Sequence, residues 1–413
     1  MERKTKSTHK KKLLVTTSTF PKWENDTVPP FIHDLSKHLT KNYEVYVLAP
    51  YSHGASLYEE RDGMYIYRYK YFPGKTLITD KAKLPFLKKH PHYFVQVPFF
   101  FIKQFIEIRR LVKKHDIELI QAHWIIPQGF VAVLYKKLIN SRVKIVVSSL
   151  GADIFGLRGK LFMKIKRWVM NNVCGLTATS NTIVEEARKI GFREDVPVEF
   201  ITMGVDVTKC MPEKYDETLK AKYGVTGHFL LFVGRLTEKK GCNYLLEAMP
   251  AILKEFPDTK LIIIGYGEDQ ASLTKLARKL DLLDKSVLFI GGVPHTELPR
   301  FYATSDILVG PSVVAKGGDS DGLPVVFIEA LCSGSAIITT DMPTLSDIVV
   351  DGETGFTVSQ RDPGQISEKV IELLRNKELM ERVGSAGREY VLKNFDWEVI
   401  ADRYSAFMDR VFK

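Results

Sequence analysis

Two short segments carry charged side chains in patterns that suit phosphate and sugar chemistry. The first is Gly234-Arg235-Leu236-Thr237-Glu238-Lys239-Lys240-Gly241, which follows the apolar run 229–233. That run predicts a buried strand, and Cys242–Lys254 predicts a helix after it. Ligands of parallel α/β sheets bind at such strand-to-helix turns. Arg235 and Lys240 therefore suit a diphosphate, because a guanidinium can hold two oxygens and an ammonium adds a point charge.

The second segment is Asp321-Gly322-Leu323-Pro324-Val325-Val326-Phe327-Ile328-Glu329-Ala330. On a helix, the spacing of Asp321 and Glu329 returns to nearly the same face a little over two turns later. We expect both carboxylates to point into one cleft and to accept hydrogen bonds from sugar hydroxyls. The N–H groups at the helix entrance would face phosphate oxygens. The entrance residues are Gly322, Leu323, Pro324 and Val325. Together the two segments predict a nucleotide-sugar site.

Strand and helix patterns alternate along the chain and would position these segments. Amphipathic stretches such as 98–114 and 181–190 separate apolar runs, and a second series of runs opens at Phe229. This alternation predicts parallel, doubly wound sheets. The predicted strands are 12–17, 44–49, 117–122, 143–148, 175–179, 196–201, 229–233, 260–264, 286–290, 306–309 and 336–339. We place a polar, turn-rich linker at 203–226.

The motifs resemble those of the retaining glycosyltransferases of family 4, the group 1 glycosyl transferases. That family has a Gly-Arg…Lys-Gly turn, then an acid, seven residues and Glu-Ala. Similar family motifs follow in order at 309–312, 329–335 and 351–356, and Met203-Gly204-Val205-Asp206 resembles the interdomain Asn-Gly-Val-Asp. The resemblance implies an α/β protein of GT-B fold with two facing, Rossmann-like, doubly wound domains. We expect an acceptor-side domain at 1–205, a donor-binding domain at 206–395 and a last helix at 396–413 that crosses back.

The resemblance also implies a retaining, metal-independent hexosyltransferase without a cofactor. Gly234, Arg235 and Lys240 would bind the donor, and the two cations would stabilise the departing diphosphate. Glu329 would accept hydrogen bonds from the ribose, which would give a buried acid a partner. Asp321 stands where the family has a Glu that contacts the donor sugar, so its reach is one methylene shorter. We interpret Asp319-Ser320-Asp321 as an acidic loop rather than a metal site.

Two residues of the first domain are candidates for the acceptor or sugar side. His123 ends a predicted strand, so its imidazole is either a ligand contact or a structural histidine. Asp153 belongs to Leu150-Gly151-Ala152-Asp153, where the family has His-Gly-x-Asp. Leu150 therefore removes one expected sugar contact. The segment 20–26 replaces the family's early Gly-Gly loop and is expected to border the cleft.

The positive charge is concentrated in the first half of the chain. The net charge is +10, but residues 1–200 hold 34 Lys and Arg against 18 Asp and Glu. A basic surface attracts anionic lipid, nucleic acid or phosphorylated acceptors, although it is also compatible with ordinary solvated lysines. The stretch 99–110 is expected either to insert shallowly into a membrane or to pack on the first sheet. The basic loop 81–89 lies nearby.

The cysteines, the start of the chain and the apolar runs indicate where in the cell the protein is expected to work. The cysteines Cys174, Cys210, Cys242 and Cys332 form no Cys-x-x-Cys pair, which favours a reducing compartment. The basic start lacks the features of a secretory signal, and the apolar runs are too short for a transmembrane helix. We expect a cytoplasmic enzyme that moves a hexose from a nucleotide sugar to a lipid-linked or glycan acceptor in envelope or exopolysaccharide synthesis. UDP-sugar is favoured over GDP-sugar, and an anionic membrane surface is a candidate partner.

Other functions remain open from the sequence. A GT-B-fold epimerase would need acid and base residues across the sugar, and a phosphorylase would need a cofactor lysine site. A nucleic-acid-binding or membrane-binding protein, including a DNA glycosyltransferase, would use the basic half. Nucleic acid is not an expected partner, because aromatic and basic residues do not interleave as in known RNA-binding motifs.

Overall fold

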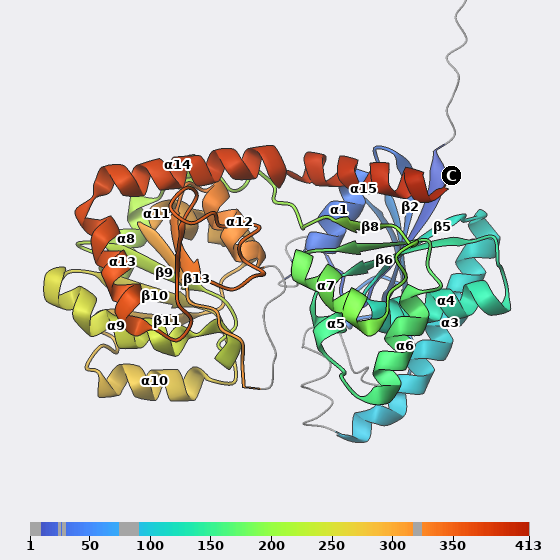
Figure 1. The fold of residues 1–413 in the computed structure, drawn as a ribbon, viewed down its shortest axis with the longest axis horizontal. Helices are drawn as coiled ribbons and strands as arrows, with labels where there is room; N and C mark the ends of the chain where they lie inside the picture. Colours follow the sequence, from blue (N-terminus) through green and yellow to red (C-terminus); the bar gives the residue numbers. More distant parts are fainter. Residues whose placement is uncertain (1–9, 24–25, 27–29, 74–90, 317–323, 413) are drawn as a thin grey trace, which may run out of the picture. The chain divides into compact units, whose positions relative to one another are not determined.

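The computed structural model describes residues 10–23, 26, 30–73, 91–316 and 324–412 of the chain. The chain folds into two compact units, each built around one α/β sheet (Figure 1). The first unit comprises Met1–Thr179, Ile183–Ile201 and Ala401–Lys413, and the second comprises Ser180–Thr182 and Thr202–Ile400. The segment 203–226, expected to be a linker, is therefore part of the second unit.

The first unit contains an eight-stranded sheet in the order β3-β4-β2-β1-β5-β6-β7-β8. All neighbouring strands are parallel except β3 and β4, an antiparallel pair that the sequence analysis did not predict. The strand order reverses between β1 and β5, where a doubly wound sheet binds its ligands. The bounds are β1 Lys11–Thr16, β2 Tyr43–Pro50, β3 Tyr58–Arg61, β4 Met64–Tyr69, β5 Leu119–His123, β6 Lys144–Ser149, β7 Gly175–Ala178 and β8 Val198–Phe200.

The second unit contains a six-stranded, fully parallel sheet in the order β11-β10-β9-β12-β13-β14. Its order reverses between β9 and β12, so this unit also has one switch point. The bounds are β9 Phe229–Val233, β10 Lys260–Ile264, β11 Val287–Gly291, β12 Ile307–Gly310, β13 Ala336–Thr340 and β14 Phe356–Val358. Both sheets are Rossmann-like, which confirms the predicted α/β class.

Helices connect the strands and cover the sheets (Figure 1). In the first unit they are α1 Phe31–Leu39, α3 Gln96–His115, α4 Phe130–Leu138, α5 Ala152–Phe155, α6 Lys160–Met170 and α7 Asn181–Ile190. In the second unit they are α8 Glu217–Tyr223, α9 Cys242–Glu255, α10 Gln270–Lys279, α11 Leu298–Thr304, α12 Val325–Cys332, α13 Pro363–Arg375 and α14 Lys377–Asn394. The final helix, α15 Trp397–Phe412, contributes residues from 401 onward to the first unit.

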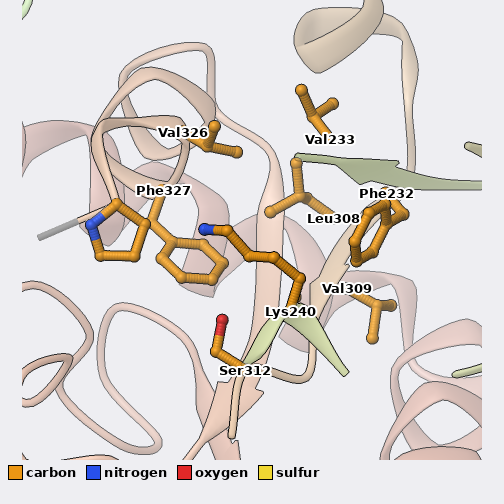
Figure 2. Close-up of a pocket in the computed structure, with 10 residues that line it drawn as sticks. Phe232, Val233, Lys240, Leu308, Val309, Ser312, Val326 and Phe327 are labelled. Atoms are coloured by element: carbon orange, nitrogen blue, oxygen red, sulfur yellow. The ribbon is translucent and has the colours of Figure 1, made fainter. Parts of the chain in front are cut away.

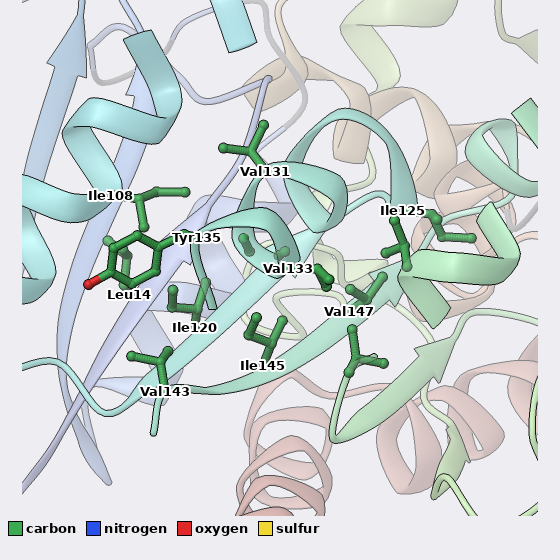
Figure 3. Close-up of a cluster of buried hydrophobic side chains, with 14 of the residues drawn as sticks. Leu14, Ile108, Ile120, Ile125, Val131, Val133, Tyr135, Val143, Ile145 and Val147 are labelled. Atoms are coloured by element: carbon green, nitrogen blue, oxygen red, sulfur yellow. The ribbon is translucent and has the colours of Figure 1, made fainter. Parts of the chain in front are cut away.

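The core of the first unit forms where α3 and α4 pack on the central strands. Figure 3 shows Ile108 of α3 and Tyr135 of α4 beside Leu14, Ile120 and Ile145 of β1, β5 and β6. These strands are nearly continuous apolar runs because helices cover parallel sheets on both faces.

The final helix packs on the same sheet and contacts strands β6 and β7. Gly175 begins β7 and leaves room for the ring of Phe407 in α15, which would lie 2.7 Å from a Cβ at that position. Lys144 Nζ donates to Val411 O at 3.0 Å, which fastens the end of the helix to β6. The end of the chain is therefore part of the first unit's fold.

Candidate functional site

Lys240 lies in a small pocket at the switch point of the second sheet. The turn that follows β9 and the end of β12 meet there. Figure 2 shows the amine end of Lys240 directed toward Val326 and Phe327, in the first turn of α12. A Cβ at Gly234 would lie 3.7 Å from the Lys240 stem, so the lysine packs over this glycine. The pocket is lined by Phe232, Val233, Lys240, Leu308, Val309, Gly310, Ser312, Pro324, Val326 and Phe327.

A close backbone approach at Gly241 brings the two loops of the switch point together. Gly241 has a φ of 63°, and a Cβ on it would lie 1.8 Å from the carbonyl oxygen of Pro311. Only glycine fits such a contact. Beside it, Val313 N donates to Lys239 O at 2.8 Å. The position of Lys240 relative to β12 therefore depends on a residue without a side chain.

The glycines of Gly265-Tyr266-Gly267 support the same turn. Gly265 has a φ of 138°, and a Cβ there would lie 1.9 Å from Gly234 O. A Cβ at Gly267 would lie 1.9 Å from Leu236 O, and Leu236 N donates to Tyr266 O at 3.0 Å. These residues serve the packing of the loop that carries Arg235 and Lys240. In this loop Arg235 is exposed and Lys240 is half-buried.

The acidic segment is only partly described. Asp321, Gly322 and Leu323 lie outside the described residues. Pro324 immediately precedes α12, which begins at Val325, and Pro324 also lines the Lys240 pocket. The start of α12 is thus at the switch point, as its predicted role requires.

Glu329 is buried in α12 and has two protein partners. Its Oε1 lies 2.8 Å from Nε2 of His295, and its Oε2 accepts from the Tyr302 hydroxyl at 3.0 Å. Tyr302 is fully buried, and burial together with Glu329 raises its pKa well above the usual value. A ribose would therefore be a further partner of Glu329, in addition to those the protein supplies.

His295 and Tyr302 were not among the predicted site residues. His295 follows the carboxyl end of β11, and its side chain is 40% exposed. The only sequence signal for His295 is a polar residue just beyond a predicted strand. Its contact with Glu329 spans 34 positions of the chain, so spacing could not reveal it.

His123 ends β5 at the switch point of the first sheet, but its side chain is fully buried. Neither ring nitrogen has a hydrogen-bond partner among the described residues. Burial lowers the pKa of His123 to about 3, so the imidazole is neutral at physiological pH. A contact with a sugar would require neighbouring side chains to move.

Asp153 holds the loop that follows His123. Its Oδ2 accepts from Ile125 N at 2.8 Å, and its Oδ1 accepts from the Ser149 hydroxyl at 3.0 Å and from Leu150 N at 3.2 Å. Burial raises the pKa of Asp153, and these hydrogen bonds oppose that rise. Both oxygens of this predicted sugar-side residue are thus engaged by the protein. In this structure Asp153 positions the β5–α4 loop.

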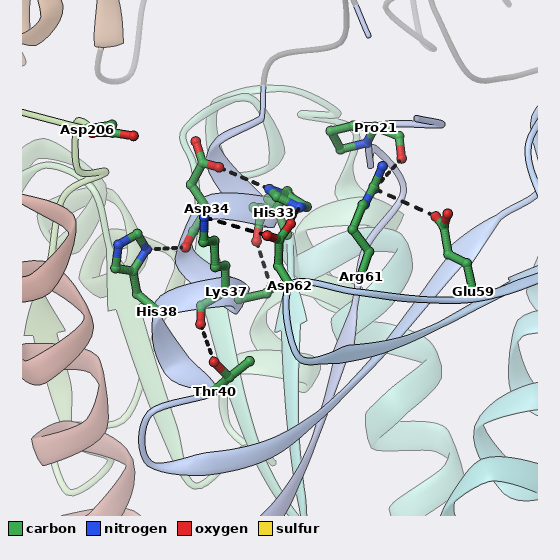
Figure 4. A network of polar contacts seen from close by, with 12 residues as sticks. Pro21, His33, Asp34, Lys37, His38, Thr40, Glu59, Arg61, Asp62 and Asp206 are labelled. Atoms are coloured by element: carbon green, nitrogen blue, oxygen red, sulfur yellow. Dashed lines mark hydrogen bonds and ion pairs between the residues drawn. The ribbon is translucent and has the colours of Figure 1, made fainter. Parts of the chain in front are cut away.

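Pro21, in the segment that replaces the family's Gly-Gly motif, is held by the unpredicted β3–β4 pair. Arg61 and Arg68 each donate to Pro21 O, at 3.1 and 2.8 Å, and Figure 4 shows the Arg61 contact. In the same network, the ring nitrogens of His33 lie 3.0 Å from Asp34 Oδ1 and 2.9 Å from Asp62 Oδ2. The side chains that hold Pro21 therefore come from outside the segment 20–26.

The described part of the chain lacks both a metal-binding cluster and a membrane-spanning helix. No group of three or more His, Cys, Asp or Glu side chains there is arranged to hold a metal ion. Within the same residues, no helix combines the length and apolar character needed to span a bilayer.

Solved structures with the same fold are glycosyltransferases and related synthases. Sucrose-phosphate synthase from Thermosynechococcus elongatus aligns with a TM-score of 0.77 and 18% identity, over 97% of this chain and 99% of that chain. HepE of Anabaena, solved with UDP-glucose, aligns with a TM-score of 0.73 and 16% identity over 97% and 99%. The fold is GT-B.

The family follows from the sequence. Residues 216–390 match the family described as Glycosyl transferases group 1, and residues 29–209 match Glycosyltransferase Family 4. The chain therefore belongs to the group 1 glycosyltransferases of family 4, and its enzyme class is glycosyltransferase. A relative from Mycolicibacterium smegmatis is 24% identical over 96% of this chain and 98% of its own length. That protein is a GDP-mannose-dependent alpha-(1-6)-phosphatidylinositol monomannoside mannosyltransferase.

Proposed function

We propose that this glycosyltransferase moves a hexose from a GDP-sugar to a lipid-linked or glycan acceptor. The observation that carries the proposal is Lys240, held over Gly234 in a pocket at the switch point of the second sheet. Arg235 is exposed on the same turn. The two cations bind the diphosphate and stabilise the negative charge that grows on it as the glycosidic bond breaks.

The remaining donor contacts come from the α12 segment. In this proposal the backbone N–H groups of Gly322, Leu323 and Val325 would face phosphate oxygens, and Asp321 would accept a hydrogen bond from the donor sugar. Glu329, oriented by His295 and Tyr302, binds the ribose. The sequence analysis put UDP-sugar first, but several relatives are named for GDP-mannose, which favours GDP for this chain.

We also propose that the transfer retains the anomeric configuration and needs no metal. Arg235, Lys240 and the helix start supply the charge stabilisation that a metal would otherwise provide. In the first domain the sequence places no obvious carboxylate as a nucleophile, and Asp153 is engaged by three hydrogen-bond donors. Departure and attack on one face of the sugar therefore fit the site better than a double displacement.

The donor is tested by thermal shift with GDP-, UDP- and ADP-sugars, because a ligand that binds the native state raises the unfolding temperature. GDP-mannose should give the largest shift, and shifts by none of these donors would refute the donor site. Activity abolished by EDTA and restored by magnesium would contradict the metal-free mechanism. A product of inverted anomeric configuration, read by NMR, would contradict retention.

For the acceptor we propose a lipid-linked or envelope glycan, with the enzyme working in the cytoplasm at the inner membrane face. The relative from Mycolicibacterium smegmatis is named for a phosphatidylinositol mannoside acceptor, which supports a lipid-linked substrate here. The basic first half of the chain is compatible with an anionic membrane. Transfer to a water-soluble glycan but never to a lipid-linked one would refute this choice of acceptor.

A further inference from the structure

The first three turns of α3 expose a row of large apolar side chains. Phe99, Ile102 and Ile106 are 48%, 58% and 48% exposed, and Val95, just before the helix, is 60% exposed. Intervals of three and four residues place all of them on one face of the helix. Single exposed apolar residues need no explanation, but a contiguous patch marks an interaction site.

The last two turns of α3 are basic, and Arg109 and Lys113 continue the face of Ile102 and Ile106. Arg109, Arg110, Lys113 and Lys114 are all exposed. Within α3 the only acid is Glu107, which is mostly buried and lies 2.9 Å from Lys103 and 2.6 Å from Arg110. The exposed surface of α3 is thus apolar at its start and cationic at its end. We call these eight residues, Val95, Phe99, Ile102, Ile106, Arg109, Arg110, Lys113 and Lys114, the docking face.

The opposite side of α3 packs inside the first unit, which is one of the two alternatives given for the stretch 99–110. Phe100 is buried, and the ring centroid of Phe101 lies 5.7 Å from that of Phe130 in α4. Phe130 in turn lies 5.8 Å from Trp168 of α6. Three residues of the docking face also touch the first unit at its margins: the Phe99 ring lies 5.5 Å from that of Phe72, and Arg110 and Lys114 lie 5.5 and 5.7 Å from the ring of Tyr67. The exposed side chains of Ile102, Ile106, Arg109 and Lys113 form the middle of the docking face.

The start of α6 also combines exposed apolar residues with basic residues. Leu161 and Phe162 are exposed there, Lys160 and Lys164 lie beside them in the sequence, and α6 contains no acid. Helices α3, α4 and α6 pack in a row, and each begins where a parallel strand or its loop has ended. Their first turns therefore lie toward the carboxyl edge of the sheet, where His123 ends β5.

We propose that the docking face binds an anionic lipid bilayer, an inference that rests on the proposed lipid-linked acceptor. The apolar start of α3 inserts at the boundary between headgroups and acyl chains, and the basic end contacts anionic headgroups. This orientation brings the carboxyl edge of the first sheet toward the membrane. A lipid-linked acceptor then reaches that edge without leaving the bilayer.

Charge selects the bilayer over other occupants. A second copy of the chain, in a symmetric dimer, would set the four basic residues either against the same four of its partner or against the partner's apolar residues, and neither arrangement pairs the cations with an anion. Nucleic acid would match the cations but not Ile102 and Ile106, which cannot stack on bases as aromatic side chains do. An anionic bilayer satisfies both halves of the face.

The test is co-sedimentation of the full chain with vesicles of mixed phosphatidylglycerol and phosphatidylcholine, and with phosphatidylcholine alone. Arg109→Gln with Lys113→Gln should weaken binding to the anionic vesicles by about 25-fold, at roughly 5-fold per basic residue. Ile102→Ser with Ile106→Ser should weaken it by about 10-fold or more. The matched control is Arg278→Gln with Lys279→Gln, which removes two exposed charges from α10 and should leave binding unchanged.

Three outcomes would overturn the proposal. The first is that the protein binds neutral vesicles as well as anionic ones. The second is that the control variant loses as much vesicle binding as the docking-face variants do. The third is that a docking-face variant changes the oligomeric state in light scattering but leaves vesicle binding unchanged. The GDP-mannose thermal shift of each variant keeps this test separate from the proposed function. Vesicle binding by a protein that binds no nucleotide sugar would refute the donor proposal and leave the docking face supported. A normal donor shift without vesicle binding would refute only the docking face.

Discussion

Glu329 offers the sharpest test of the donor site, because the structure separates its structural contacts from its proposed ligand contact. Tyr302 is fully buried and donates to Glu329 Oε2 at 3.0 Å. A hydrogen bond to a charged group contributes about 1.5–3 kcal/mol to stability. Glu329→Ala removes this acceptor and leaves the buried Tyr302 hydroxyl without it. We expect a loss of about 2–3 kcal/mol in the free energy of unfolding.

In a folding unit of this size, such a loss lowers the unfolding temperature by roughly 4–12 °C. Glu329→Gln keeps an oxygen that can accept from Tyr302, so its stability should stay close to that of the wild type. Its neutral amide, however, binds ribose hydroxyls more weakly than a carboxylate does. We expect its affinity for GDP-mannose to fall about 10-fold.

Tyr302→Phe is the matched control, since it removes the hydroxyl and leaves the carboxylate with His295. It removes the same hydrogen bond to a charged group, so it should lower stability by about 1.5–3 kcal/mol, but it should leave donor affinity nearly unchanged. Urea unfolding measures the stabilities, and titration calorimetry with GDP-mannose measures the affinities. Wild-type affinity in Glu329→Gln would refute the ribose contact. Wild-type stability in Glu329→Ala would refute the network as a structural element.

Three further predictions address the other parts of the site. Lys240→Ala should lower kcat by roughly 100-fold, because it removes charge stabilisation that grows in the transition state, whereas Lys239→Ala should retain most activity. Steady-state kinetics measure both variants, and near-normal turnover of Lys240→Ala would show that the diphosphate binds elsewhere. Gly241→Ala places a methyl group against the carbonyl oxygen of Pro311 and strains a residue with a φ of 63°. We expect the free energy of unfolding, measured in urea, to fall by more than about 2 kcal/mol, and an unchanged unfolding midpoint would contradict the close contact. His123 has a folded-state pKa of about 3, which is below its pKa in the unfolded chain. At a pH between these two pKa values the unfolded state binds more protons, so stability falls as the pH falls from about 6.5 toward 3. This residue should contribute about 1.4 kcal/mol of that loss per pH unit between pH 6 and 4, and His123→Gln should flatten the slope; an identical acid limb in both proteins would show that His123 is not buried in its neutral form.

Local patterns in the sequence were enough to predict the fold class and the family. Nearly continuous apolar runs alternate with amphipathic stretches, and in a chain of this length such alternation leads to parallel sheets covered by helices. The turn from Gly234 to Gly241 was also predictable, because a glycine-flanked pair of cations after an apolar run is a pattern of neighbours along the chain. Both predicted sheets are present, and helix α7 has the bounds Asn181–Ile190 that the periodicity indicated.

Contacts between distant residues could not be predicted in this way. Strand β3 is too polar to stand out as a buried strand, whereas β4 is mostly buried but carries Arg68 among its apolar and aromatic residues. The arginines of this antiparallel pair reach back to Pro21. Burial of His123 depends on the tertiary packing around the end of β5, which no local pattern shows. The side of α3 that stays exposed depends on which of its phenylalanines meets α4.

The division between sequence and tertiary structure is clearest at Glu329. The sequence alone determined that an acid lies eight residues after Asp321 in an apolar helix, because helical spacing is a local property. Only the folded chain decided that His295 and Tyr302 hold that acid, because a buried carboxylate binds whichever donors the packing brings within hydrogen-bond distance.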